Sequence, residues 1–244
     1  MSASIGRLLL AVFALLAGAI SSRAATLQIE PVLIDVAAPG AASTVSLRNE
    51  GTTPINAQIR VFRWSQVDSK EKLEPTEEVV ASPPAVTLAA NGSYVARIVR
   101  VSKRPISGEE SYRVLIDQLP ATQQKRTSAV NLLVLVRYSI PVFFGASERR
   151  DPAVAWSVVV SGTKVKVTAR KDGDRRLRVA ALNIRNNKGK TVSFSKGLVG
   201  YVLGKSTIAW TASAGGFAAD GPVAISAQGD TGPVEAVAAV NSAR

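Results

Sequence analysis

Residues 130–144 are an apolar segment that constrains the fold more strongly than any other part of the chain. In an extended chain, successive side chains point to opposite faces. Leu132, Val134 and Val136 therefore share one face, while Leu133 and Leu135 share the other. A strand that is apolar on both faces needs cover on both faces. One cover is the core of its own domain, and the other is either the same chain or a partner that pairs with the strand.

The first 25 residues have the three parts of a secretory signal peptide. Arg7 supplies the positive charge, residues 8–20 are an unbroken run of apolar and small residues, and small residues precede a cleavage site after Ala24 or Ala25. The apolar run is shorter than the ~20 residues that span a bilayer. We therefore expect cleavage, export and no stable membrane insertion.

The sequence contains neither cysteine nor histidine. An exported domain without disulfides must be stabilised by its hydrophobic core. The missing residue types exclude Ser-His-Asp and Cys-His mechanisms and cysteine-ligated metals, and they remove the commonest general base and transition-metal ligand. We therefore expect no enzymatic activity, no metal and no cofactor.

The chain is basic, with 30 Lys and Arg residues against 18 Asp and Glu residues. Loss of Arg7 and Arg23 with the signal peptide leaves 28 basic residues and a net charge of +10. Such a surface keeps a protein soluble and favours anionic partners. Proteins that stack bases interleave aromatic and basic residues, and no basic run of this sequence does so. We therefore expect no nucleic-acid partner.

Short runs rich in Val, Ile, Leu and Thr, separated by Gly, Asn, Pro and Asp, predict strands throughout the mature chain. Seven runs precede residue 146, at 26–36, 43–48, 55–67, 79–88, 93–102, 112–119 and 130–144. Pro83-Pro84 interrupts the fourth run and belongs at an edge, a bulge or a switch between sheets, because proline lacks an N–H. Residues 70–78 have the composition of a connector that could hold a helical turn. Seven short strands at this spacing predict an immunoglobulin-like sandwich.

A polar, charged segment at 146–152 ends in proline and predicts a domain boundary. Further strand-like runs follow at 154–160, 164–170, 176–185, 191–194, 201–203, 207–211 and 223–227. We expect the tail after Gly232 to be frayed, and Arg175, Arg176 and Arg178 to form a solvated basic turn. The predicted organisation is an all-β protein with a signal peptide (1–25), an N-terminal immunoglobulin-like domain (26–146) and a C-terminal one (147–244).

Several motifs occur in an order and spacing that resemble the periplasmic pilus-assembly chaperones of the chaperone–usher pathway. The motifs are LQIEP at 27–31, LRN at 47–49, VFRW at 61–64, SPP at 82–84, Asn91-Gly92 followed by Arg97 and Arg100, YRVLIDQLP at 112–120 and YSIPVF at 138–143. The sixth-strand and seventh-strand motifs are similar to those of the archaic branch of that family. The resemblance implies two sandwiches in a boomerang arrangement with a cleft between them.

The resemblance also implies a function. A pilus subunit is an immunoglobulin-like domain that lacks its last strand, and the chaperone fills the resulting groove with its own seventh strand, here residues 128–145. Alignment on YSIPVF implies that Leu133 and Leu135 face the chaperone's own core and that the donated residues are Val130, Leu132, Val134 and Val136. The implied partners are pilus subunits and an outer-membrane usher. A homodimer that caps the free strand is left open.

Better-known members of the family hold the subunit's C-terminal carboxylate with an Arg in the first strand and a Lys in the seventh. Here those positions fall on Leu33 and Pro141, whose side chains cannot bind a carboxylate. A guanidinium offers a carboxylate two parallel hydrogen bonds. We therefore expect the anchors to be Arg113 first and Arg137 second, with Arg97 and Arg100 in reserve.

Three aromatic residues have structural interpretations. We expect Trp64 in the core or on a sheet face of the first sandwich, and Tyr112 and Phe143 at the junction of the domains.

The alternative function is an exported adhesive or structural surface protein with two immunoglobulin-like domains. That protein would bury or offer its seventh strand permanently, whereas a chaperone must bind and release.

Overall fold

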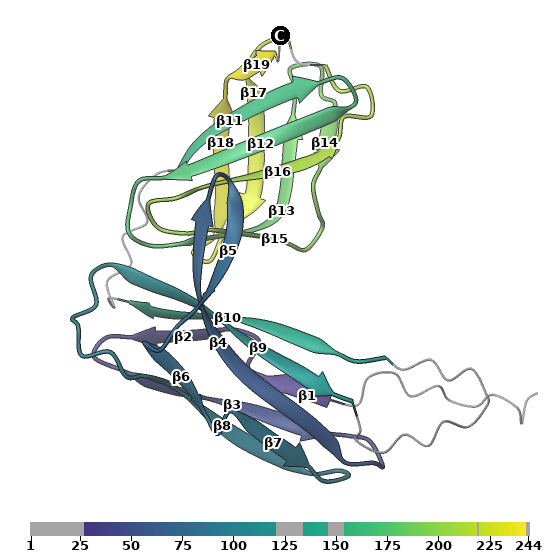
Figure 1. Ribbon diagram of the computed structural model, residues 1–244. Coiled ribbons are helices and arrows are strands. Elements are labelled where there is room, and N and C mark those ends of the chain that lie inside the picture. The colour runs from purple at the N-terminus through teal and green to yellow at the C-terminus, as the bar shows by residue number, and fades with distance from the viewer. Residues whose placement is uncertain (1–26, 121–133, 146–153, 219, 243–244) are drawn as a thin grey trace, which may run out of the picture.

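The computed structural model describes residues 27–120, 134–145, 154–218 and 220–242. The expected signal peptide, the predicted boundary at 146–152 and two expected donor residues, Val130 and Leu132, lie outside the described residues. Among the described residues every regular element is a strand, and no helix is long and apolar enough to cross a membrane. Figure 1 shows two β-sandwiches at an angle to each other. The expected all-β fold with two immunoglobulin-like sandwiches is confirmed.

The first sandwich consists of two sheets. One has the strand order β1-β3-β8-β6, and the other has the order β2-β10-β9-β4-β5 with β7 also paired to β4. The strands are β1 (Leu27–Glu30), β2 (Ile34–Ala37), β3 (Ala42–Asn49), β4 (Ile55–Val67), β5 (Lys70–Pro75), β6 (Val79–Ser82), β7 (Ala85–Leu88), β8 (Ser93–Arg100), β9 (Glu109–Leu119) and β10 (Arg137–Gly145).

Two of the expected strands change sheet partway along. β1 pairs with β3 in one sheet, and β2 runs parallel to β10 in the other, with Pro31 between them. Likewise β6 pairs with β8 and β7 with β4, so Pro83-Pro84 marks a switch between sheets, which was one of its expected places. Proline cannot donate a ladder hydrogen bond, which favours a change of sheet at Pro31 and at Pro83-Pro84. The expected strands at 26–36 and 79–88 therefore each become two observed strands.

The expectation of a helical turn at 70–78 is wrong, because Lys70–Pro75 forms β5 and pairs antiparallel with β4. Asp68 and Ser69 join the two strands with φ angles of 51° and 62°. Positive φ at both central residues is the geometry of a two-residue hairpin. Figure 1 shows this hairpin rising from the first sandwich to the second, where Ser69 forms an isolated bridge with Ile208.

Alternate residues of the facing strands fill the first core. Ile55, Ala57 and Ile59 point inward from β4, as the alternation of that run predicts. Burying an isoleucine side chain fully stabilises the folded state by about 1.5–3 kcal/mol. The other main contributors are Leu27, Val45, Leu47, Ile98, Tyr112, Val114, Ile116, Ile140, Val142 and Phe144. Tyr112 therefore belongs to this core, and the expectation that it packs at the domain junction is wrong.

The second sandwich pairs the sheet β16-β12-β11-β19 with the sheet β14-β13-β17-β18, in which β15 also pairs with β13. Its strands are β11 (Val154–Ser161), β12 (Lys164–Lys171), β13 (Leu177–Arg185), β14 (Thr191–Ser193), β15 (Leu198–Val202), β16 (Thr207–Ser213), β17 (Val223–Gln228), β18 (Pro233–Ala238) and β19 (Val240–Ser242). The expected frayed tail is wrong, because β18 pairs with β17 and β19 runs parallel to β11. Ala238 is buried in the second core, which holds this segment in place.

Candidate functional site

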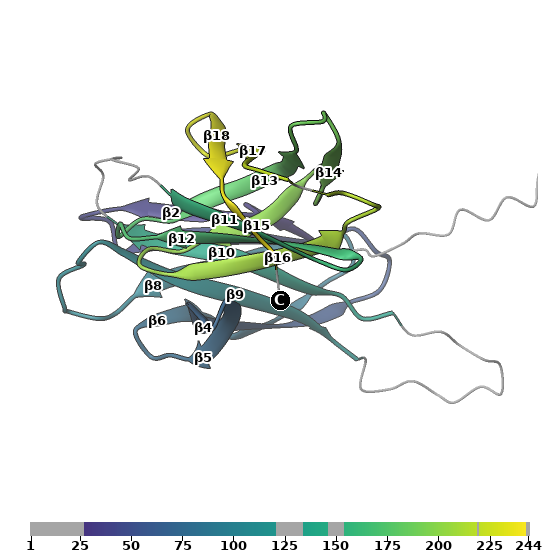
Figure 2. The same cartoon turned by 90° about the horizontal axis from the view of Figure 1, so that it is seen from above.

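The sheet β2-β10-β9-β4 turns its outer face toward the second sandwich. Figure 1 shows β10, β9 and β4 on the side nearest the second sandwich, and Figure 2 shows β11, β12 and β16 lying over them. Residues paired across strands lie on the same face, so the register defines rows on this surface. Arg113 lies opposite Phe62 on β4 and Pro141 on β10, and Asp117 lies opposite Arg137.

At one end of this face, an apolar cluster joins the two sandwiches. Trp64 and Phe143 from the first sandwich pack against Tyr201 and Leu203 from the second, with Leu33 beside them. The ring centroids lie 5.6–5.8 Å apart, with Trp64 edge-on to Tyr201. Phe143 therefore lies at the domain junction, as expected. Leu33 therefore lies in an apolar environment, which suits its side chain.

Gln66 adds a polar clamp next to this cluster. Its side-chain amide donates to the carbonyl of Tyr201 at 2.7 Å. Its side-chain oxygen accepts from the N–H of Leu203 at 3.0 Å and from the hydroxyl of Ser206 at 2.8 Å. The bonds to Tyr201 and Leu203 are buried, so removal of the Gln66 side chain would leave these two backbone groups without these partners.

The expectation that Arg176 belongs to a solvated turn is wrong. Its side chain is only 5% exposed, and its guanidinium lies 3.7 Å above the ring of Phe143. It pairs with Glu109 at 2.5 Å and with Asp35 at 2.6 Å, both from the first sandwich. Burial lowers the pKa of Arg176, but Glu109 and Asp35 outweigh that effect, so the pKa lies above its ordinary value. The two sandwiches are therefore joined by a buried ion-pair network as well as by the apolar cluster.

Arg113 lies beside this junction, on the row that contains Pro141. Its guanidinium carbon lies 3.7 Å from the centre of the Trp64 ring, and its side chain is 14% exposed. Burial lowers the pKa of Arg113, and the nearby Glu71 and Tyr201 partly offset that effect. The guanidinium still remains charged, as arginine does in proteins. Within the described part of the chain it makes no hydrogen bond, so its N–H groups can donate to a carboxylate.

Arg137 lies on the same face but is already engaged. Its Nε donates to Asp117, and Arg60 approaches the other oxygen of that carboxylate at 2.6 Å. Burial raises the pKa of Asp117, but the hydrogen bonds from Arg137 and Arg60 outweigh it and hold the pKa below its ordinary value. The side chain of Arg137 is 62% exposed. Of the two expected anchors, Arg113 has the donors without partners and Arg137 has a competing internal carboxylate.

The two reserve anchors do not lie on this face. Arg97 is exposed on β8, in the other sheet of the first sandwich. Arg100 is almost fully buried and is committed to Glu110, to which it donates at 2.8 and 2.9 Å, and to the carbonyls of Ser102 and Arg104. Both are therefore separated from the carboxylate site suggested by Arg113.

Residues 134–136 immediately precede β10 and continue its inner face beyond the core of the first sandwich. Ile140, Val142 and Phe144 are buried, and alternation puts Val136 and Val134 on the same side. The N–H of Gln118 donates to the carbonyl of Val136 at 3.0 Å, so pairing with β9 extends to this residue. Val134, however, is 62% exposed. An apolar stripe therefore leaves the sandwich core and enters solvent.

Leu135 corrects one expectation. It was expected to face the core of its own domain, but it is 43% exposed and lines a shallow hollow with Arg60, Asp117 and Arg137. The parity of the strand explains this, because Leu135 shares the outer face with Arg137 and Phe143. Leu133, which has the same parity, lies outside the described residues.

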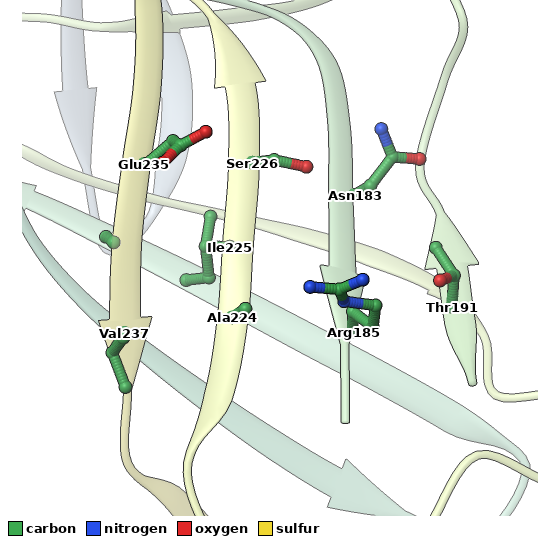
Figure 3. A pocket seen from close by; sticks show the side chains of 9 residues that line it. Asn183, Arg185, Thr191, Ala224, Ile225, Ser226, Glu235 and Val237 are labelled. Carbon is green, nitrogen blue, oxygen red and sulfur yellow. The ribbon is translucent and has the colours of Figure 1, made fainter. Parts of the chain in front are cut away.

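A second hollow lies on the second sandwich, across β14, β13, β17 and β18. Figure 3 shows Arg185, Glu235 and Val237 around it. It contains none of the residues that the sequence singles out, and it lies on strands remote from Arg113 in the sheet order. The candidate site is therefore the face of the first sandwich that is turned toward the second sandwich, rather than this hollow.

Gln66 is a junction residue that sequence reasoning missed, and Arg176 is one whose buried position it did not predict. One signal was present for the first of them. The alternation of 55–67 places Trp64 and Gln66 on the face opposite to Ile55 and Ile59, so a large aromatic residue points away from its own core. An outward Trp indicates a second cover, which the second sandwich supplies.

The comparisons with known proteins agree with this architecture. Residues 26–147 match the family described as pili and flagellar-assembly chaperone, PapD N-terminal domain. No curated protein matches the chain in sequence. Among solved structures, the chain is similar to one in the CsuC–CsuE chaperone–tip adhesion subunit pre-assembly complex from archaic chaperone–usher Csu pili of Acinetobacter baumannii. That alignment has 24% identity and a TM-score of 0.65, and covers 90% of this chain and 100% of the other.

Two further structures show the same likeness. A chain from the Salmonella enterica SafA pilin–SafB chaperone complex is 19% identical with a TM-score of 0.59, covering 89% of this chain and 98% of its own. The Pseudomonas aeruginosa CupB2 chaperone is 17% identical with a TM-score of 0.57, covering 88% of this chain and 100% of its own. At these identities the likeness shows a shared fold.

Proposed function

Because this chain belongs to the family of pili and flagellar-assembly chaperones, we propose that it captures pilus subunits in the periplasm by lending them its seventh strand. It then delivers them to an outer-membrane usher. Capture and release proceed by pairing and exchange of strands, without a catalytic step. Subunits released in this way would enter a growing pilus.

The observation that carries this proposal is the apolar stripe at the start of β10. Val142 and Ile140 are covered by the first sandwich, whereas Val134 on the same face is 62% exposed. An apolar stripe that continues from a core into solvent marks a surface on which another molecule can bind. A subunit with an open groove supplies that cover, and its unpaired strand edges gain main-chain hydrogen bonds from the donated strand. On this proposal Val130, Leu132, Val134 and Val136 enter the groove.

The second element of the proposal is the anchor for the subunit's C-terminal carboxylate. Arg113 is the primary anchor because its guanidinium is held flat against Trp64 and has no hydrogen-bond partner among the described residues. A carboxylate can take two parallel hydrogen bonds from such a group. Arg137 is the secondary anchor, because it must first leave Asp117. Arg97 and Arg100 have no part in this site.

The test is co-expression with a pilin-like subunit that lacks its last strand, followed by purification through a tag on this protein. We compare Val134→Arg with Val95→Arg. Val95 is similarly exposed, at 55%, but lies on β8 in the sheet that faces away from the cleft. The proposal predicts a one-to-one complex with the wild type and with Val95→Arg, and none with Val134→Arg, although all three proteins fold.

The opposite result is equally clear. Equal capture by Val134→Arg and Val95→Arg would refute strand donation at this segment. Absence of any complex, together with strong hydrogen-exchange protection of the 130–136 amides in the free monomer, would show a strand that is already covered. That outcome would favour an adhesive or structural surface protein.

A further inference from the structure

Glu71 is the carboxylate nearest to Arg113, and it comes from the hairpin that reaches the second sandwich. Its Oε1 lies 3.7 Å from Nη2 of Arg113. In the register of the hairpin, Glu71 lies opposite Gln66, and Leu73 lies opposite Trp64. Because paired residues share a face, Glu71 projects from the same surface as Trp64, on which Arg113 is stacked.

The contact between Glu71 and Arg113 is close enough to neutralise charge but too long for a hydrogen bond. The Glu71 side chain is 45% exposed, so solvent screens the attraction. Within the described part of the chain, Glu71 has no other ion pair. Its neighbour Lys72 pairs with Glu74 at 2.8 Å instead. The other five residues of β5 are also exposed, so no packing fixes Glu71 in place. A carboxylate in this position can leave Arg113 at little cost.

We propose that Glu71 is an internal counter-ion, which occupies the carboxylate site of Arg113 in the free protein and moves aside when a subunit's terminal carboxylate arrives. This inference rests on the proposed role of Arg113 in capture. Two carboxylates beside one guanidinium repel each other, so Glu71 lowers the affinity for the incoming group. A ligand must therefore displace Glu71 in order to bind Arg113, and the return of Glu71 favours release.

The experiment observes the Nε–H signal of Arg113 by NMR in protein labelled at arginine, with assignment from Arg113→Lys. Sodium acetate is the probe, titrated against sodium chloride at equal ionic strength. We compare wild type, Glu71→Gln and the matched control Glu74→Gln, which removes the same charge from the same strand. In Glu71→Gln we expect the free Arg113 signal to shift and the acetate dissociation constant to fall about two- to fivefold. In Glu74→Gln we expect neither change.

Equal acetate affinity in wild type and Glu71→Gln, or an identical decrease in Glu74→Gln, would overturn the inference. Acetate that leaves the Arg113 signal unchanged in every protein would overturn it too. Failure of the proposed function has a different signature, which is normal capture of a subunit by Arg113→Ala. The two hypotheses can therefore fail separately.

Discussion

The guanidinium of Arg113 is stacked on the indole of Trp64, with 3.7 Å between its central carbon and the ring centroid. Trp64 is also packed against Phe143 and Tyr201 at the domain junction. The junction that joins the two sandwiches thus provides the platform that orients the arginine. A cation over an aromatic ring gains about 0.5–2 kcal/mol, depending on its exposure. An arginine held in this way loses little further side-chain freedom when a carboxylate binds.

The stacked geometry predicts that lysine cannot replace Arg113. Arg113→Lys keeps the charge but loses both the planar stacking on Trp64 and the two-pronged hydrogen bonding to a carboxylate. We expect subunit affinity to fall at least about tenfold, which corresponds to about 1.4 kcal/mol. Competition between wild-type and variant chaperones for a limiting amount of subunit measures the loss.

Arg97→Lys is the control for this change, because Arg97 is exposed on the other sheet. It should compete as well as the wild type does. Undiminished competition by Arg113→Lys would show that charge alone suffices, and would remove the argument from stacking and bidentate geometry.

The clamp made by Gln66 predicts a large cost for a single polar truncation. Gln66→Ala leaves the carbonyl of Tyr201 and the N–H of Leu203 buried without these hydrogen bonds. We expect a loss of about 1–3 kcal/mol in the free energy of unfolding. Urea unfolding followed by tryptophan fluorescence measures it. Gln28→Ala, at an exposed position of β1, should stay within about 0.5 kcal/mol of the wild type.

The pair of Arg100 and Glu110 predicts a dependence of stability on pH. The hydrogen bond from Arg100 lowers the pKa of Glu110, against a smaller rise caused by burial. Because the folded-state pKa is lowered, the stabilisation is present above the unfolded pKa of about 4.3 and is lost as pH falls through the folded value. Glu110→Gln should therefore cost about 2 kcal/mol at pH 7, and the difference from wild type should shrink at pH 3.

Urea titrations of both proteins at the two pH values test this prediction. Glu50→Gln is the matched control, since Glu50 is a half-exposed partner of Arg48 at 3.6 Å. Its effect should stay below about 0.5 kcal/mol. A difference between wild type and Glu110→Gln that is the same at pH 7 and pH 3 would contradict the assigned linkage.

Most of the fold could be predicted from local patterns. The alternation of Ile55, Ala57 and Ile59 identifies the inner face of β4, and prolines at 31 and 83–84 lie where the chain changes sheet. The errors arose where pairing overrides composition. Residues 70–75 are charged and look like a connector, yet a two-residue turn at Asp68-Ser69 folds them back onto β4.

The amino-acid sequence alone shows which side chains of a strand share a face, because strand periodicity is local. It also determined that no histidine or cysteine chemistry is available and that an apolar stripe runs through Val134 and Val136. Only the tertiary structure decided what covers the outward face. Arg176 is distant in sequence from Glu109 and Asp35, yet docking of the sandwiches brings the three together and buries the side chains of Arg176 and Glu109. The same docking gives Trp64 its apolar cover and places Arg113 beside Glu71, because a residue's environment depends on contacts that no local pattern encodes.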